Sequence, residues 1–130
     1  MNAKTRGSCN CGTVTFQIHT VLNDVYICHC SICRKSTGSG GIAVCVVPNT
    51  QFEWLTGQND IKTWYKPGHD WETTFCTYCG SPLPGKNDDN STYIPASLLD
   101  TNTEALAVKK HIFTCSKAPW EVIPDNDGAE

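Results

Sequence analysis

Three short groups of cysteines stand out in the sequence, and their spacing is that of metal ligands. Seven of the nine cysteines in this chain fall into Cys9-x-Cys11, Cys28-x-Cys30-x-x-Cys33 and Cys76-x-x-Cys79. Zinc binds thiolates tetrahedrally, and two cysteines one to four residues apart on a tight turn can present both sulfurs to one ion. The three groups therefore predict metal binding, and thiolate ligands with an exchangeable position favour zinc.

The seven cysteines divide most simply into a set of four and a set of three. Joining the two-cysteine groups gives a closed four-thiolate site of Cys9, Cys11, Cys76 and Cys79. We expect this site to be structural, because its cage leaves no position for another ligand. The remaining group, Cys28, Cys30 and Cys33, supplies three ligands and leaves a fourth position for water or substrate. Two zinc ions per chain are therefore expected, one structural and one catalytic.

Disulfides are the main alternative, because short cysteine-rich chains are often secreted scaffolds. An odd number of cysteines and the absence of an apolar signal segment in residues 1–7 oppose that interpretation. The Cys-x-Cys spacing is also too short for easy bridging within a pair. An iron–sulfur cluster is a weaker alternative, because the ferredoxin spacings are absent. Thiolate ligands thus predict a reducing compartment, which for this chain we take to be the cytoplasm.

Length and composition predict one soluble domain over residues 1–130, with an ordered core over about 7–123 and a flexible tail over 124–130. Because only 39% of the residues are hydrophobic, we expect the metal sites to contribute folding free energy. A net charge of −3 and well-spread cations argue against nucleic acid as a partner. No apolar run is long enough to span a membrane.

The elements that must position the cysteines read as strands, because apolar residues alternate with period two more often than they repeat at helical spacing. An all-β fold with little helix is therefore expected. The predicted strands are 13–19, 25–27, 41–47, 51–55, 61–65, 72–75 and 110–115. The turn-forming residues 57–60 predict that 51–55 and 61–65 form a hairpin. Periodicity leaves 97–108 open between a helical turn and a strand.

Several further residues have a chemical and a structural interpretation. In an extended segment the side chain of His29 would point away from those of its neighbouring cysteines, which favours a structural role over that of a general base. For His111 both roles stay open. Cys45 lies among aliphatic residues and reads as a small core residue, whereas Cys115 reads as an exposed thiol. Of the four tryptophans, we expect at least two in the core and Trp120 beside the site.

Longer motifs surround the three cysteine groups and extend over most of the chain. They read Gly7-Ser8-Cys9-Asn10-Cys11-Gly12, Cys28-His29-Cys30-Ser31-Ile32-Cys33-Arg34-Lys35 with Gly38, and Phe75-Cys76-Thr77-Tyr78-Cys79-Gly80-Ser81. Together with Trp54-Leu55-x-Gly57, Leu99-Asp100, His111-Ile112-Phe113 and Lys117-Ala118-Pro119-Trp120, they resemble the glutathione-dependent formaldehyde-activating enzyme family. The resemblance covers residue 7 to about residue 123.

The resemblance implies an Mss4-like fold of several small antiparallel sheets around zinc knuckles. It implies the same two zinc ions, with the same division of ligands. The activity it implies is the condensation of glutathione with formaldehyde to S-hydroxymethylglutathione, which is classed as a carbon–sulfur lyase reaction. The partners would then be glutathione or a similar thiol and a small aldehyde.

The chemistry of a three-thiolate site suits such a substrate. Three thiolates on Zn²⁺ leave a net charge of −1, which makes a poor activator of water and favours a soft incoming ligand such as a thiol. The carboxylates of glutathione would need cations, and the candidates are Arg34, Lys35 and Lys117, with Trp120 as a further substrate contact. Adjacent cations such as Arg34 and Lys35 are, however, more often solvated surface than a binding clamp.

Two departures from the family pattern bear on the substrate. Relatives commonly carry a basic residue shortly before the second knuckle, where this chain has Glu72-Thr73-Thr74, and often close with Asp-x-Leu-Pro, where it has residues 123–127. Two other functions stay open: a non-catalytic module that binds glutathione or zinc, and a zinc-stabilised protein-interaction domain. The second would make all seven cysteines structural.

Overall fold

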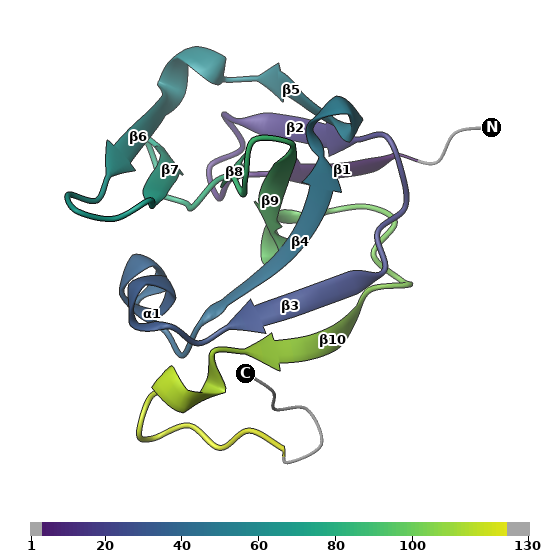
Figure 1. The fold of residues 1–130 in the computed structure, drawn as a ribbon. Coiled ribbons are helices and arrows are strands. Elements are labelled where there is room, and N and C mark those ends of the chain that lie inside the picture. The colour runs from purple at the N-terminus through teal and green to yellow at the C-terminus, as the bar shows by residue number, and fades with distance from the viewer. Residues whose placement is uncertain (1–3, 125–130) are drawn as a thin grey trace.

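Ten strands in three sheets form the framework of the computed structural model, which describes residues 4–124 (Figure 1). The strand-rich architecture with several small sheets is the one expected from the sequence. One sheet is antiparallel and has the order β1-β2-β5. Its strands are β1 (Thr5–Ser8), β2 (Thr15–Ile18) and β5 (Phe52–Thr56). β1 and β2 flank the turn that carries Cys9 and Cys11, so this sheet positions the first ligand group.

The second sheet has the order β10-β3-β4-β9-β8 and positions the three-cysteine group. Its strands are β10 (Ala107–Ile112), β3 (Asp24–Cys28), β4 (Ile42–Pro48), β9 (Ser91–Pro95) and β8 (Gly85–Lys86). All neighbours are antiparallel except β10 and β3, which run parallel. Cys28 ends β3 and lies opposite Ile42 on β4.

The third sheet is a two-stranded ribbon of β6 (Ile61–Tyr65) and β7 (Glu72–Cys76), which ends on the second knuckle. Short 3-10 helices connect the sheets: η1 (Asn49–Gln51), η2 (Gln58–Asp60), η3 (Ala96–Leu98) and η4 (Thr114–Ser116). Figure 1 shows the ribbon on the same side of the molecule as α1 (Ser31–Thr37). Within residues 4–124, no helix is long and apolar enough to cross a bilayer.

The main core lies between the three-stranded and five-stranded sheets. Its fully buried members include Phe16, Ile18, Val47 and Ile94, which come from alternating positions of β2, β4 and β9. Cys45 is 1% exposed in the same cluster, which confirms it as a small core residue.

The tryptophans are less buried than predicted. Trp54 and Trp71 are only half-buried, although each packs against a buried cluster, and Trp64 and Trp120 are exposed.

The predicted hairpin of 51–55 and 61–65 is wrong. β5 pairs with β2, and β6 pairs with β7 in a different sheet. Gly57 adopts a left-handed φ of 81°, and the turn that follows it carries the chain from one sheet to the other. Period-two alternation identifies a strand but not its partner, so a turn-rich connection between two strands was compatible with either arrangement.

Two other segments differ from the prediction. The seven-residue helix α1 was not indicated by hydrophobic periodicity, because seven residues are too few to show a helical period. The predicted strand 110–115 ends at Ile112, where Phe113 turns the chain with φ 56° into a 3-10 turn. The segment left open, 97–108, contains a 3-10 turn and the start of β10. The predicted tail lies, except for Pro124, outside the described residues.

Candidate metal centres

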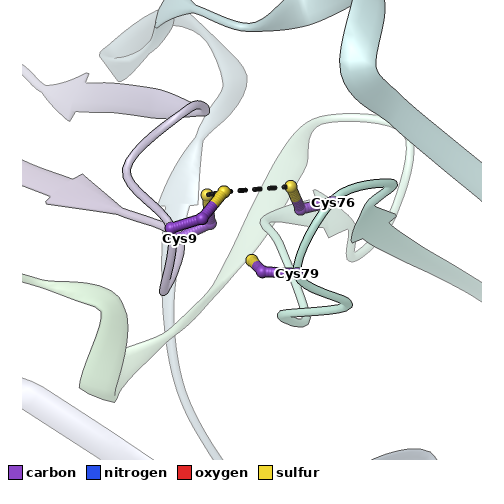
Figure 2. A group of neighbouring side chains, drawn as sticks. Cys9, Cys76 and Cys79 are labelled. Carbon is purple, nitrogen blue, oxygen red and sulfur yellow. Dashed lines mark hydrogen bonds between the residues drawn. The ribbon is translucent and has the colours of Figure 1, made fainter.

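Four cysteines meet where two knuckles face each other. Cys9 and Cys11 lie on the turn after β1, and Cys76 and Cys79 lie at the end of β7. Figure 2 shows the sulfurs of Cys9, Cys76 and Cys79 directed toward one another from these two turns. All four Sγ atoms lie within 4.8 Å of one another. The structure therefore brings together the four residues that spacing assigned to one site.

The sulfur separations fit a tetrahedral ion. In a tetrahedral site with Zn–S near 2.3 Å, neighbouring sulfurs are about 3.8 Å apart. Here Sγ of Cys11 is 3.6 Å from Sγ of Cys9 and 3.8 Å from Sγ of Cys76. Cys9 and Cys76 are 3% and 0% exposed, whereas Cys11 is exposed and Cys79 is half-buried, so an ion at this place would be covered on the side of Cys9 and Cys76. The donor set and its geometry fit a closed, structural zinc site.

Hydrogen bonds tie the two knuckles together and favour thiolates. The Ser81 hydroxyl accepts from the backbone N–H of Asn10 at 2.9 Å, which joins the second knuckle to the first. Hydrogen bonding with the Ser81 side chain, 3.3 Å away, lowers the pKa of Cys79 to about 5. The backbone N–H of Val14 donates to Sγ of Cys9 at 3.3 Å. Amides and hydroxyls directed at sulfur stabilise its charged form.

Three further cysteines meet where β3 ends and α1 begins. Cys28 is the last residue of β3, Cys30 is the N-cap of α1, and Cys33 lies in the first turn of the helix. The Cys30 sulfur accepts from the backbone N–H of Cys33 at 3.3 Å, so the turn that carries the ligands also caps the helix. Gly38, in the left-handed region at φ 65°, ends the helix.

Sγ of Cys33 lies close to the other two sulfurs of this group. Sγ of Cys33 is 3.1 Å from Sγ of Cys30 and 3.2 Å from Sγ of Cys28. These separations are far longer than a disulfide of about 2.05 Å, and an opening of ~0.6 Å would place the sulfurs at three corners of a zinc tetrahedron. The donor set thus fits zinc with one position left over.

Electrostatics of the three-cysteine group also favour a bound cation. Hydrogen bonding with Cys33 lowers the pKa of Cys28 to about 6. The same contact, together with burial, raises the pKa of Cys33 far above its usual value. One thiol of the group therefore loses its proton easily, and the next loses its proton only against the repulsion of the first thiolate. A bound divalent cation would remove this repulsion.

A pocket of about 420 Å³ reaches this second site and not the first. Cys28 and Cys33 are among its lining residues, although they are only 8% and 4% exposed. Ile42 and Val44 of β4 line it as well. A small ligand in the pocket would therefore lie against these two cysteines.

Aromatic side chains form part of the pocket wall. The rings of Trp71 and Tyr93 stack with centroids 6.3 Å apart and an interplanar angle of 19°. The indole N–H of Trp71 donates to the Thr73 hydroxyl at 3.0 Å. Burial raises the pKa of Tyr93 to about 12, so its phenol keeps its proton at neutral pH. The spacing of Cys28, Cys30 and Cys33 could not have identified this wall, because β9 and the β6–β7 loop are remote from these three residues in sequence.

His29 supports the ligand turn from the side away from the pocket. Its side chain is fully buried and does not line the pocket. Nδ1 lies 3.1 Å from the carbonyl oxygen of Gly40 and 3.4 Å from Oε1 of Glu121, and Nε2 lies 2.8 Å from Nδ1 of His111. These contacts join the turn between Cys28 and Cys30 to the C-terminal segment, as expected for a structural role of His29, which stays a prediction.

The four residues predicted to contact substrate lie outside this pocket. Arg34 and Lys35 are on α1, and Lys35 lines a different hollow together with Lys66. The ammonium of Lys117 donates to the carbonyl oxygen of Glu121 at 3.0 Å, and Trp120 is 71% exposed. Their role in binding stays a prediction.

Comparison with known proteins agrees with this architecture. The profile of the family described as "Glutathione-dependent formaldehyde-activating enzyme" matches residues 4–116. A Halomonas elongata protein provisionally named a glutathione-dependent formaldehyde-activating enzyme is 34% identical over 85 residues, which are 59% of this chain and 52% of the relative. The chain thus spans about half the length of this curated relative.

Among solved structures, a crystal structure of a Rhodobacter sphaeroides protein from a structural genomics programme matches with a TM-score of 0.61. The match covers 74% of this chain and 88% of the other at 19% sequence identity, and it shows a shared fold.

Proposed function

The chain belongs to the glutathione-dependent formaldehyde-activating enzyme family, and we propose that its three-cysteine site joins a thiol to a small aldehyde. In this reaction the thiol sulfur forms a bond to the carbonyl carbon, and the carbonyl becomes a hydroxyl that carries the proton lost by the thiol. Nothing is oxidised or reduced. The reverse reaction breaks the carbon–sulfur bond, so the activity is that of a carbon–sulfur lyase.

The observation that carries the proposal is the pocket that reaches Cys28 and Cys33. A purely structural knuckle needs no cavity at its sulfurs, whereas a site that exchanges a ligand does. We propose zinc at both cysteine sets, because thiolate donors at these separations suit it best. A zinc ion held by three thiolates would leave one position for a soft ligand and would favour loss of a thiol's proton.

The chain's own residues would bind the reactants and limit access of water. Trp71 and Tyr93 form an apolar wall against which the carbon chain of a thiol can pack. Ile42 and Val44 cover another part of the pocket, close to the sulfurs of Cys28 and Cys33. Holding thiol and aldehyde side by side in such a pocket would supply much of the rate acceleration. Thiolate ligands are also the reason for proposing a reducing, cytoplasmic setting.

The test is whether the zinc-loaded protein speeds exchange between an aldehyde and its thiol adduct. Exchange NMR with ¹³C-formaldehyde measures that rate, with glutathione and with 2-mercaptoethanol as the thiol. We expect acceleration by the native chain and by Cys115→Ser, which removes a cysteine outside both metal sets. Cys30→Ser should lose it. Exchange no faster than in buffer with either thiol would favour a non-catalytic binding module or an interaction domain.

A further inference from the structure

The charges around the pocket that reaches Cys28 and Cys33 are mostly negative. Its lining includes four carboxylates and a single ammonium: Asp70, Glu72, Asp88, Asp89 and Lys86. The pocket therefore differs from what a ligand with two carboxylates needs, which is a majority of cations or amide donors. The acidic rim, as we call these four carboxylates, borders a site that is itself negative, because three thiolates outweigh one divalent ion.

Asp88 and Asp89 of the acidic rim each have a close polar partner. Nζ of Lys86 lies 3.3 Å from Oδ1 of Asp89. Oδ1 of Asp88 accepts hydrogen bonds from the backbone N–H of Asn90 and the hydroxyl of Ser91, both at 2.8 Å.

Within residues 4–124, no ion pair or side-chain hydrogen bond engages the carboxylates of Asp70 and Glu72. Their charges contribute, after that of Asp89, to raising the pKa of Lys86, so a cationic ligand would share these two carboxylates with Lys86.

Glu72 lines the pocket that reaches Cys28 and Cys33. It begins β7 and neighbours the wall residue Trp71, which stacks on Tyr93. Trp71 and Tyr93 pack against the buried cluster that contains Cys28 and Cys33, and Glu72 lines the same pocket as these residues. A ligand that filled this pocket as far as Cys33 would therefore share it with the Glu72 carboxylate.

From this arrangement we propose that the site selects a thiol that carries a positive charge a few bonds from its sulfur, rather than the anionic tripeptide glutathione. The inference rests on the proposed function and names the substrate class of the same site. An ammonium group gains from the acidic rim and from the faces of Trp71 and Tyr93, which attract cations. A carboxylate in the same place is repelled.

The test compares three thiols of similar size and different charge: thiocholine, 2-mercaptoethanol and 3-mercaptopropionate. The protein is loaded with cobalt(II) in place of zinc, so that thiol ligation is read from the visible absorption of the metal. Metal content is measured after each titration, which separates ligation from loss of the ion. The quantity of interest is the affinity ratio of thiocholine to 3-mercaptopropionate, because intrinsic differences between the thiols cancel when this ratio is compared between variants.

We expect the native protein to favour thiocholine. In Asp70→Asn/Glu72→Gln the ratio should fall by about tenfold, since two partly exposed charges are removed. Lys86→Gln should raise the ratio, and Glu104→Gln, a matched loss of charge outside the pocket, should leave it unchanged. An unchanged ratio in the double variant, with all three thiols still altering the spectrum, would overturn the inference and leave the proposed function standing. Failure of every thiol to alter the spectrum would contradict the proposed function itself.

Discussion

The stability that a ligand cysteine contributes depends on the length of chain that its metal bond closes into a loop. Cys76 is fully buried and joins the β7 knuckle to Cys11, 65 residues away in sequence, whereas Cys30 holds only the start of a seven-residue helix. Without this closure the unfolded chain regains conformational entropy, which lowers the free energy of unfolding by about 4 kcal/mol in addition to the loss of the metal bonds. Cys76→Ser should therefore lose most of the protein's stability and Cys30→Ser about 1 kcal/mol. Thermal melts followed by circular dichroism measure both. Equal loss in the two variants would mean that the three-cysteine group is structural.

Ser81 tests the hydrogen bonds between the two knuckles. Its hydroxyl accepts from Asn10 N–H and contacts Sγ of Cys79, so Ser81→Ala removes two contacts without touching a ligand. We expect a loss of about 1–2 kcal/mol in urea unfolding of the zinc-loaded protein. Ser36→Ala, which changes a serine of α1 outside the knuckles, is the control. A Ser81 variant as stable as this control would show that the bridge between knuckles carries no stability.

At the residue scale, the sequence predicted the cysteine sets and little else of the site. Ligand spacing is local, so Cys28, Cys30 and Cys33 can be read directly from the chain. The wall residue Tyr93 comes from a distant strand, and only the sheet topology brings it to the pocket. The stretch 72–74 was visible as a departure from the family pattern, but the place of Glu72 in the pocket lining was not.

The connection between β5 and β6 requires a glycine at position 57. Its φ of 81° disfavours any side chain, and a Cβ there would lie 2.5 Å from the carbonyl oxygen of Thr13. Gly68 has a similar φ of 79° with open space around it. We expect Gly68→Ala to cost about 1 kcal/mol and Gly57→Ala about 3 kcal/mol, measured by urea unfolding. Similar costs would mean that the backbone of the Thr13 turn adapts freely.

Strand positions were predictable because alternation is a local signal, and β6 matches its predicted range at 61–65. Pairing was not predictable, because it depends on where the chain crosses from one sheet to another. The helix α1 was missed for a similar reason. Seven residues capped by Cys30 and Gly38 are too short to show a helical period, and the cap is a sulfur already assigned to metal.

For the whole molecule, the two metal sets should differ in how firmly they hold zinc. The four-cysteine set is a closed cage between two sheets, whereas the pocket gives solutes access to the three-cysteine set. Mild chelation should therefore remove one zinc equivalent with the fold intact, and stronger chelation the second with unfolding. Elemental analysis paired with circular dichroism follows both steps. Simultaneous loss of both ions, or fresh reduced protein with under half an equivalent of zinc, would contradict this order.

The most direct test of the central claim, that the three-cysteine site accepts a thiol sulfur, is calorimetry of the zinc-loaded protein in two buffers of different ionisation enthalpy. Glutathione is compared with S-methylglutathione, and 2-mercaptoethanol with its S-methyl ether, so that only the sulfur changes within a pair. We predict release of about one proton per site near neutral pH, affinity that rises as pH approaches the thiol pKa of ~8.5, and much weaker binding of both ethers. Equal affinity of thiol and ether, without proton release, would contradict the claim.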